Sequence, residues 1–72
     1  MNKIIKIAVD AMGGDGSPKK VIDGIIHHYE KNKNIYYQIF GDQNKITRLI
    51  NEDLPSTSFE IIHTIDVVEG TD

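Results

Sequence analysis

A short β-branched run that stops at a glycine-rich loop is the feature that most constrains how this chain folds. Residues 4–9 are apolar apart from Lys6, so they predict a buried strand. Residues 10–16 contain three glycines and two aspartates, which break a regular strand. Ser17 and Pro18 follow, and their side-chain oxygen and fixed φ suit the cap and first position of a helix. The sequence therefore predicts a strand that leads through a glycine loop into a helix.

The rest of the chain alternates in the same way between helical and extended patterns. Apolar residues recur at helical spacing over residues 21–29, and this helix is expected to end within residues 31–34. The same spacing recurs over residues 43–52, with Asp42 as the expected N-cap of the second helix. Residues 36–40 and 59–62 are apolar and aromatic enough to be the second and third strands. The order strand, helix, strand, helix, strand is typical of a parallel sheet with right-handed crossovers. We therefore expect an α/β fold, the βαβαβ opening half of a Rossmann-like α/β/α sheet.

The length of the chain bounds its organisation. Its 72 residues allow one small domain at most, and we expect no second domain within residues 1–72. Parallel sheets are normally covered on both faces, yet only two helices are predicted and none follows the third strand. The pattern therefore predicts the amino-terminal portion of a longer α/β domain, present here in truncated form.

Charge and composition exclude several functions. The chain has 8 Lys and Arg against 11 Asp and Glu, a net charge of −3, which argues against binding nucleic acid or an anionic bilayer through bulk charge. It has no Cys, so a thiol nucleophile or a redox dithiol is excluded. The apolar run near the amino terminus is too short, and too interrupted by Lys3 and Lys6, for a signal peptide or a membrane span. The expected location is the cytoplasm.

The glycine loop is the candidate binding site. Ligands of open α/β sheets bind at the carboxyl ends of the strands, and the unpaired N–H groups of a first helical turn favour an anion. Gly13, Gly14 and Gly16 would let the backbone approach a phosphate closely, with Ser17 beside them. The alternative stays open that these glycines only satisfy a turn with positive φ.

Nucleotide binding is the second alternative for the loop. A Walker A loop needs Gly-Lys followed by Ser or Thr, and none occurs. The nearest dinucleotide frame begins at Gly14 and has Lys19 where the third glycine belongs. In its favour, Asp42 follows the second strand, about where an acid would hold a ribose hydroxyl.

Two aspartates, Asp10 and Asp15, flank the loop. Two ionised carboxylates repel a phosphate unless a cation lies between them or they turn away to accept backbone N–H bonds. We therefore expect at least one of them to brace the loop and assign no metal, with a magnesium site left as an alternative.

The histidines and tyrosines give weaker indications. His27 and His28 are adjacent on a helix and project about 100° apart, so we interpret them as surface residues. His63 ends the third strand and would serve either proton transfer or the structure itself. Tyr36 and Tyr37 alternate faces of their strand and are expected to pack rather than to stack on bases.

Residues 7–15 read Ile-Ala-Val-Asp-Ala-Met-Gly-Gly-Asp, and Ser17-Pro18 and a helix beginning at residues 19–24 follow. This opening resembles the amino terminus of the bacterial phosphate acyltransferases of phospholipid synthesis. Gly41-Asp42 and the closing residues 67–72 look like the next two landmarks of that family. The resemblance covers the whole chain, but only the opening fifth or so of a typical member, judged by the size of a complete α/β enzyme.

The resemblance implies a reaction and its partners. Members of that family transfer a long acyl chain from the thioester of acyl carrier protein to inorganic phosphate, and the acyl phosphate feeds a membrane acyltransferase. They are similar to phosphotransacetylases, homodimeric, associated with the membrane peripherally, and need no cofactor. We expect no nucleic-acid partner, and we expect these 72 residues alone to be inactive as an enzyme.

The resemblance also implies phosphate- or substrate-binding positions, although it assigns no catalytic residue. The matching positions are Asp10, Gly13, Gly14 and Asp15 in the loop, then Asp42, Thr71 and Asp72 at the ends of later strands. Gly16 departs from the family, which usually carries a larger polar residue there. Two other hypotheses stay open: a stand-alone module that binds phosphate or a nucleotide, and the inactive product of a decayed gene.

Overall fold

The computed structural model describes residues 3–14 and 16–64 of the chain. Five main elements and one short 3-10 turn follow one another as β1 (Ile5–Asp10), α1 (Lys19–Lys31), β2 (Ile35–Gly41), α2 (Gln43–Ile50), η1 (Ser56–Ser58) and β3 (Phe59–His63). The predicted order of elements is confirmed. The second helix ends at Ile50 rather than at residue 52, since Asn51 has a φ of 51°, outside the helical range.

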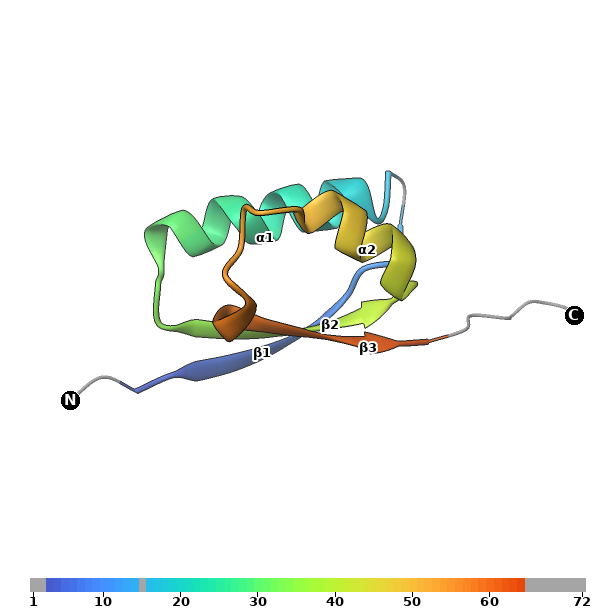
Figure 1. Ribbon diagram of the computed structural model, residues 1–72. Coiled ribbons are helices and arrows are strands. Elements are labelled where there is room, and N and C mark those ends of the chain that lie inside the picture. Colours follow the sequence, from blue (N-terminus) through green and yellow to red (C-terminus); the bar gives the residue numbers. More distant parts are fainter. Residues whose placement is uncertain (1–2, 15, 65–72) are drawn as a thin grey trace, which may run out of the picture.

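The three strands form one parallel sheet in the order β1, β2, β3. The register aligns Ile7 with Tyr37 and Tyr37 with Phe59, so β2 lies in the middle. Both helices lie on the same face of this sheet (Figure 1). The predicted βαβαβ arrangement, the opening half of a Rossmann-like sheet, is therefore confirmed.

The core lies between the sheet and the two helices. It consists of Ala11, Ile22, Ile25, Ile35, Tyr37, Ile39, Ile46, Ile50 and Leu54. Alternate residues of β2 point toward the helices, because side chains of a strand alternate between faces. Burying each large aliphatic side chain of this kind stabilises the fold by about 1.5–3 kcal/mol.

The opposite face of the sheet is covered by no helix in the part of the chain that the structure describes (Figure 1). It carries the other alternate residues of β2, among them Tyr36 and Phe40, which are half-buried. Gln38 donates from Nε2 to Oε2 of Glu60 across this face, at 2.9 Å. The expectation that a second layer is missing here agrees with the described residues.

Neither α1 nor α2 is long and apolar enough to cross a membrane.

Candidate functional site

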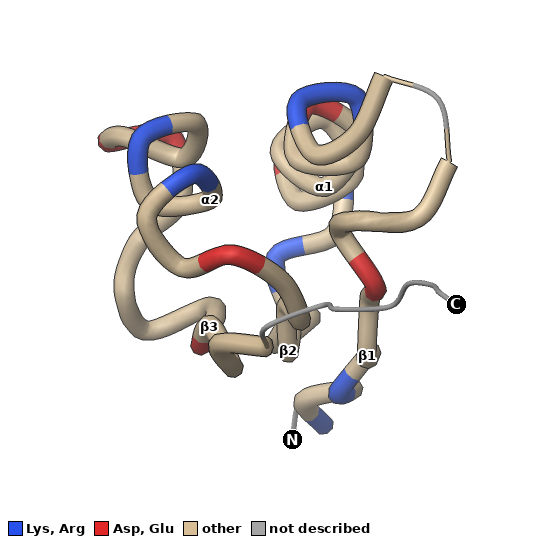
Figure 2. The backbone as a smooth tube through the Cα atoms, turned by 90° about the vertical axis from the view of Figure 1, so that its right-hand side faces the viewer, with Lys and Arg blue, Asp and Glu red and all other residues tan. Residues whose placement is uncertain are grey.

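The candidate site lies at the carboxyl edge of the sheet. The three parallel strands end there at Asp10, Gly41 and His63, and helices α1 and α2 begin there (Figure 2). Two hydrogen bonds extend the ladder past the strand ends, from Ala11 N to Phe40 O at 2.9 Å and from Thr64 N to Gly41 O at 3.0 Å. The sheet pairing therefore continues one residue past the ends of β1 and β3, where the two strand–helix connections begin.

Asp10 braces the start of the β1–α1 loop. Its Oδ1 accepts a hydrogen bond from the backbone N–H of Met12, at 2.9 Å. The carboxylate thus turns into its own loop, which is the bracing role predicted for at least one of the two aspartates. The other one, Asp15, lies outside the described residues.

The three glycines of the loop differ in backbone conformation and in the space that a Cβ would have. Gly14 and Gly16 have positive φ angles of 98° and 81°, a conformation that side chains with a Cβ rarely adopt. A Cβ on Gly13 would lie 3.4 Å from Oδ2 of Asp10, close to the braced carboxylate. Turn geometry therefore accounts for two of the three glycines, and this geometry is equally compatible with a phosphate held by the backbone.

The start of α1 differs from the prediction. The helix begins at Lys19, Pro18 occupies the N-cap position, and no side chain caps the helix. Ser17 donates its hydroxyl to the carbonyl oxygen of Gly13 instead, at 2.8 Å. The predicted cap at Ser17 and first helical position at Pro18 are therefore wrong, because the hydroxyl closes the loop on itself.

The backbone donors of this loop are partly occupied. Met12 N–H bonds Asp10, and Lys20 N–H bonds the carbonyl of Gly16 at 2.9 Å. No hydrogen bond between described residues uses the N–H groups of Gly13, Gly14 or Gly16. Together with Ser17, these groups form the anion site predicted from the sequence.

Asp42 connects β2 to α2. Its Oδ1 accepts from the N–H groups of Asn44 and Lys45, at 3.0 and 3.2 Å, so the predicted N-cap is confirmed. A further role in binding substrate or a ribose stays a prediction. The other two predicted positions, Thr71 and Asp72, lie outside the described residues.

His63 supports the same turn. Its Nδ1 accepts a hydrogen bond from the N–H of Gln43, the first residue of α2, at 3.0 Å. An accepting Nδ1 leaves the proton of a neutral imidazole on Nε2. The side chain therefore holds β3 against the start of α2, which is the structural alternative for this residue.

The close packing of Met12 and Ile46 over Gly41 was not predicted from the sequence. A Cβ there would lie 2.8 Å from Cγ of Met12 and 2.9 Å from Cδ1 of Ile46. The loop after β1 and the helix after β2 therefore meet over a residue without a side chain. No spacing rule predicts this, and the only signal in the sequence is a glycine at the end of an apolar strand.

A metal site finds no support among the described residues. No three His, Asp or Glu side chains in residues 3–14 and 16–64 are grouped so that they would hold a metal ion. The magnesium alternative between Asp10 and Asp15 stays a hypothesis, since it depends on a residue outside that part.

Comparison with known proteins identifies the family. The family model described as "Fatty acid synthesis protein" matches residues 5–72. A phosphate acyltransferase of Pelagibacter ubique is 71% identical over 72 residues, which is all of this chain and 21% of that protein. Phosphate acyltransferases of Oenococcus oeni and of a Geobacillus species are each 38% identical, over 96% and 94% of this chain and 20% of their own lengths. The chain spans about a fifth of the curated relatives it matches, and it belongs to the fatty acid synthesis protein family.

Proposed function

We propose that the chain is the phosphate-binding opening part of a phosphate acyltransferase. The observation that carries this proposal is its 71% identity, over its whole length, with a protein named phosphate acyltransferase. The reaction would transfer an acyl group from the thioester of acyl carrier protein to inorganic phosphate. The product would be an acyl phosphate for phospholipid synthesis.

The β1–α1 loop supplies the features that a phosphate needs. The N–H groups of Gly13, Gly14 and Gly16 are not used by other described residues, and they precede the positive end of the α1 dipole. The carboxylate of Asp10 is directed to Met12 N–H, which limits its repulsion of an anion. The Ser17 hydroxyl donates its proton to the carbonyl oxygen of Gly13, so its oxygen would only accept from a protonated oxygen of the phosphate.

The reaction depends mainly on the position of the phosphate relative to the thioester. An oxygen of phosphate attacks the thioester carbonyl carbon, and the new C–O bond gives a tetrahedral oxyanion. Its collapse breaks the C–S bond and leaves the acyl phosphate, and the departing thiolate takes up the proton that the phosphate gives up, so that a thiol is released. Phosphate is itself a competent nucleophile, so the loop would contribute by holding it in line with the carbonyl. This route uses no cofactor.

Further proposals follow from the family but concern residues or surfaces beyond the loop. Asp15, Asp42, Thr71 and Asp72 would add to the substrate site. We also propose homodimerisation, acyl carrier protein as the donor and peripheral association with the membrane for the whole protein.

The test is equilibrium unfolding of the 72-residue chain, followed by circular dichroism, at increasing phosphate. A ligand at ten times its Kd stabilises the folded state by about 1.4 kcal/mol, so the unfolding midpoint should rise and saturate. Potassium chloride at matched ionic strength is the salt control. The variant Gly14→Ala, which alters a backbone with φ of 98°, should lose the response.

A matched variant separates the loop from general stability. Gly24→Ala lies on α1 with nothing within 4 Å of the new Cβ, so it should keep the full response to phosphate. An equal loss in both variants, or no response in the parent chain, would contradict the proposal. A midpoint that responds to a nucleotide but not to phosphate would favour the nucleotide alternative instead.

A further inference from the structure

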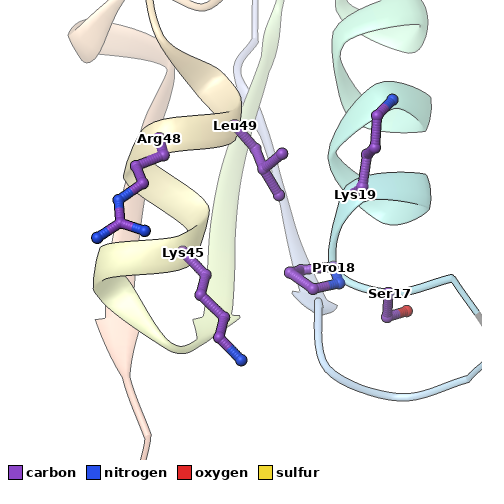
Figure 3. A pocket seen from close by; sticks show the side chains of 6 residues that line it. All are labelled: Ser17, Pro18, Lys19, Lys45, Arg48 and Leu49. Atoms are coloured by element: carbon purple, nitrogen blue, oxygen red, sulfur yellow. The ribbon is translucent and has the colours of Figure 1, made fainter.

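Two pockets lie at opposite edges of the sheet. The first is a groove between the amino-terminal halves of α1 and α2, and Pro18 and Leu49 point into it (Figure 3). Its lining consists of Ser17, Pro18, Lys19, Lys45, Arg48 and Leu49. Because Ser17 belongs to the glycine loop, this groove is part of the carboxyl edge and its candidate site. The second pocket lies at the amino edge, which the proposed function does not use.

The amino-edge pocket lies where the three parallel strands begin. Its lining includes Tyr29, Lys33, Ile35, Tyr36 and Ser58, which come from the end of α1, the start of β2 and the η1 turn. These segments lie at the same end of the sheet (Figure 1). Its volume is about 310 Å³, at the lower limit of small-molecule pockets. The size therefore suits one compact ligand.

Ser58 is a buried polar residue that the fold does not explain. Its side chain is in a residue only 8% exposed, and its backbone N–H donates to the carbonyl oxygen of Pro55 at 2.9 Å. No hydrogen bond within residues 3–14 and 16–64 uses its hydroxyl. A buried hydroxyl without a partner costs free energy, so an apolar residue would give a more stable fold. A residue that breaks this rule in the wall of a pocket indicates a ligand.

One cation stands at the margin of the same pocket. Nζ of Lys33 lies 4.5 Å from the centroid of the Tyr29 ring, a cation–π contact that holds the ammonium in place. Lys33 forms no ion pair with another described residue, and no described residue that lines the pocket is acidic. The pocket therefore presents a positive charge on a chain whose net charge is −3.

The end of α1 limits how much negative charge a ligand can carry. The helix ends at Lys31, two residues before Lys33, and the carboxyl terminus of a helix has a partial negative charge. A doubly charged phosphate ester is disfavoured beside this helix end, whereas a single carboxylate can pair with the lysine.

We propose that the amino-edge pocket binds a small hydroxylated carboxylate, an acid with one negative charge, a compact apolar body and a hydroxyl group. Its carboxylate would pair with Lys33, its apolar body would lie against Ile35 and Tyr36, and its hydroxyl would bond that of Ser58. The inference goes beyond the proposed function, because the glycine loop lies at the opposite edge of the sheet.

The test follows amide NMR shifts of the 72-residue chain during titration with para-hydroxybenzoate and with benzoate. Para-hydroxybenzoate should bind about fivefold tighter, since one more hydrogen bond forms in a buried place. Ser58→Ala should remove this difference between the two ligands. Ser56→Ala is the matched control, because Ser56 is exposed in the same η1 turn and does not line the pocket.

A second pair of ligands tests the charge. Para-hydroxybenzyl alcohol replaces the carboxylate by an uncharged group, and it should bind the parent chain about threefold more weakly than para-hydroxybenzoate. Lys33→Gln should abolish this preference. Lys31→Gln removes the same charge from the exposed end of α1, outside the pocket, and should keep it.

Stability measurements keep fold and binding distinguishable. Ser58→Ala should unfold at a higher urea concentration than the parent, because it removes a buried hydroxyl without a partner. Both Ser58→Ala and Lys33→Gln should retain the phosphate-induced shift of the unfolding midpoint. Failure of that shift in the parent chain would count against the proposed function alone.

Three results would overturn the inference. One is a Ser58→Ala variant that still prefers para-hydroxybenzoate over benzoate. Another is a Ser58→Ala variant less stable than the parent, which would show that the hydroxyl already has a partner within the fold. The third is a parent chain in which para-hydroxybenzoate causes no saturable shifts at the residues of the amino-edge pocket.

Discussion

The two strand–helix connections at the carboxyl edge differ in how they treat the free N–H groups at the start of the helix that follows. Asp42 alone joins β2 to α2, and its carboxylate accepts from two N–H groups of the first turn. The β1–α1 connection spans residues 11–18 and ends at Pro18 with no side-chain cap. Among the described residues, the side-chain oxygens of Asp10 and Ser17 bond within the loop rather than to the helix.

The difference shows where the chain leaves donors for a ligand. The β2–α2 turn satisfies its helix with a charge of its own, so an anion there would compete with Asp42. The β1–α1 loop keeps its carboxylate in a local turn and leaves the N–H groups of its glycines unused by the other described residues. The longer connection without a side-chain cap is the one that we propose to bind phosphate.

The largest effect should come from filling the point where the two connections meet. Gly41→Val would place a Cβ within 3 Å of side-chain atoms of both Met12 and Ile46, so both side chains would have to shift. Overpacking of this kind destabilises by about 1–3 kcal/mol. Chemical unfolding of the purified variant measures it.

The control for Gly41→Val is a glycine that nothing approaches. Gly24→Ala, in the middle of α1, should stabilise the chain by about 0.5–1 kcal/mol, since alanine loses less backbone entropy in a helix. If Gly41→Val unfolded at the same denaturant concentration as the parent, Met12 and Ile46 would not close over the strand end.

Removing a side-chain oxygen from each connection tests the comparison directly. Asp42→Ala should destabilise by about 1 kcal/mol, because two N–H groups of α2 lose their acceptor. Ser17→Ala should cost less, about 0.5 kcal/mol, because its hydroxyl bonds one exposed carbonyl and caps nothing. Urea unfolding of both variants gives the difference.

A conservative variant identifies the cause. Asp42→Asn keeps an oxygen acceptor at the same place and should recover most of the stability that Asp42→Ala loses. Equal losses of stability in Asp42→Ala and Ser17→Ala would contradict this difference, because both helix starts would then depend equally on a side-chain oxygen.

The electrostatic side of the same comparison predicts a smaller gain. Lys45→Glu should stabilise the chain by about 0.5 kcal/mol, since a negative charge in the first turn of α2 favours the dipole. The gain should shrink at high salt, because the site is exposed and screened. A loss of stability at low salt would indicate that Lys45 already has a favourable partner.

The order of elements could be predicted because it depends on local patterns. The apolar spacing of the two helices, the β-branched first strand and the carboxylate of Asp42 each act within a few residues, and each prediction was confirmed. The start of α1 was predicted wrongly, because the Ser17 hydroxyl had two acceptable partners. Its bond to the Gly13 carbonyl depends on how the loop folds back, which spacing alone does not give.

The contacts between elements could not be predicted. The fit of Met12 and Ile46 over Gly41 and the groove beside Leu49 each join segments that are distant in the sequence. Their existence depends on the crossing of helices over the sheet, which hydrophobic periodicity does not specify. Arg48 therefore looked like an ordinary surface residue until α1 was placed beside α2.

The smallest effect concerns the core behind both connections and tests whether the losses at the edge are local. Tyr37 of β2 is 2% exposed, and its hydroxyl is 2.7 Å from Nδ1 of His28. Burial raises the pKa of the Tyr37 phenol above its ordinary value, and the charge of nearby Tyr29 adds to the rise. Because the unfolded chain then loses the proton first, stability should be unchanged below about pH 10 and fall as the pH rises beyond it.

Urea unfolding between pH 8 and pH 11 would measure that decline, and the variants locate it. Tyr37→Phe keeps the ring and removes the phenol, so its decline above about pH 10 should be shallower than that of the parent. Tyr36→Phe removes the neighbouring phenol on the other face of the sheet and serves as the matched control. A decline flattened as much by Tyr36→Phe would mean that the buried face of β2 does not set the alkaline limit. If Asp42→Ala shows the parent's slope, its loss of stability belongs to the helix start and not to the core.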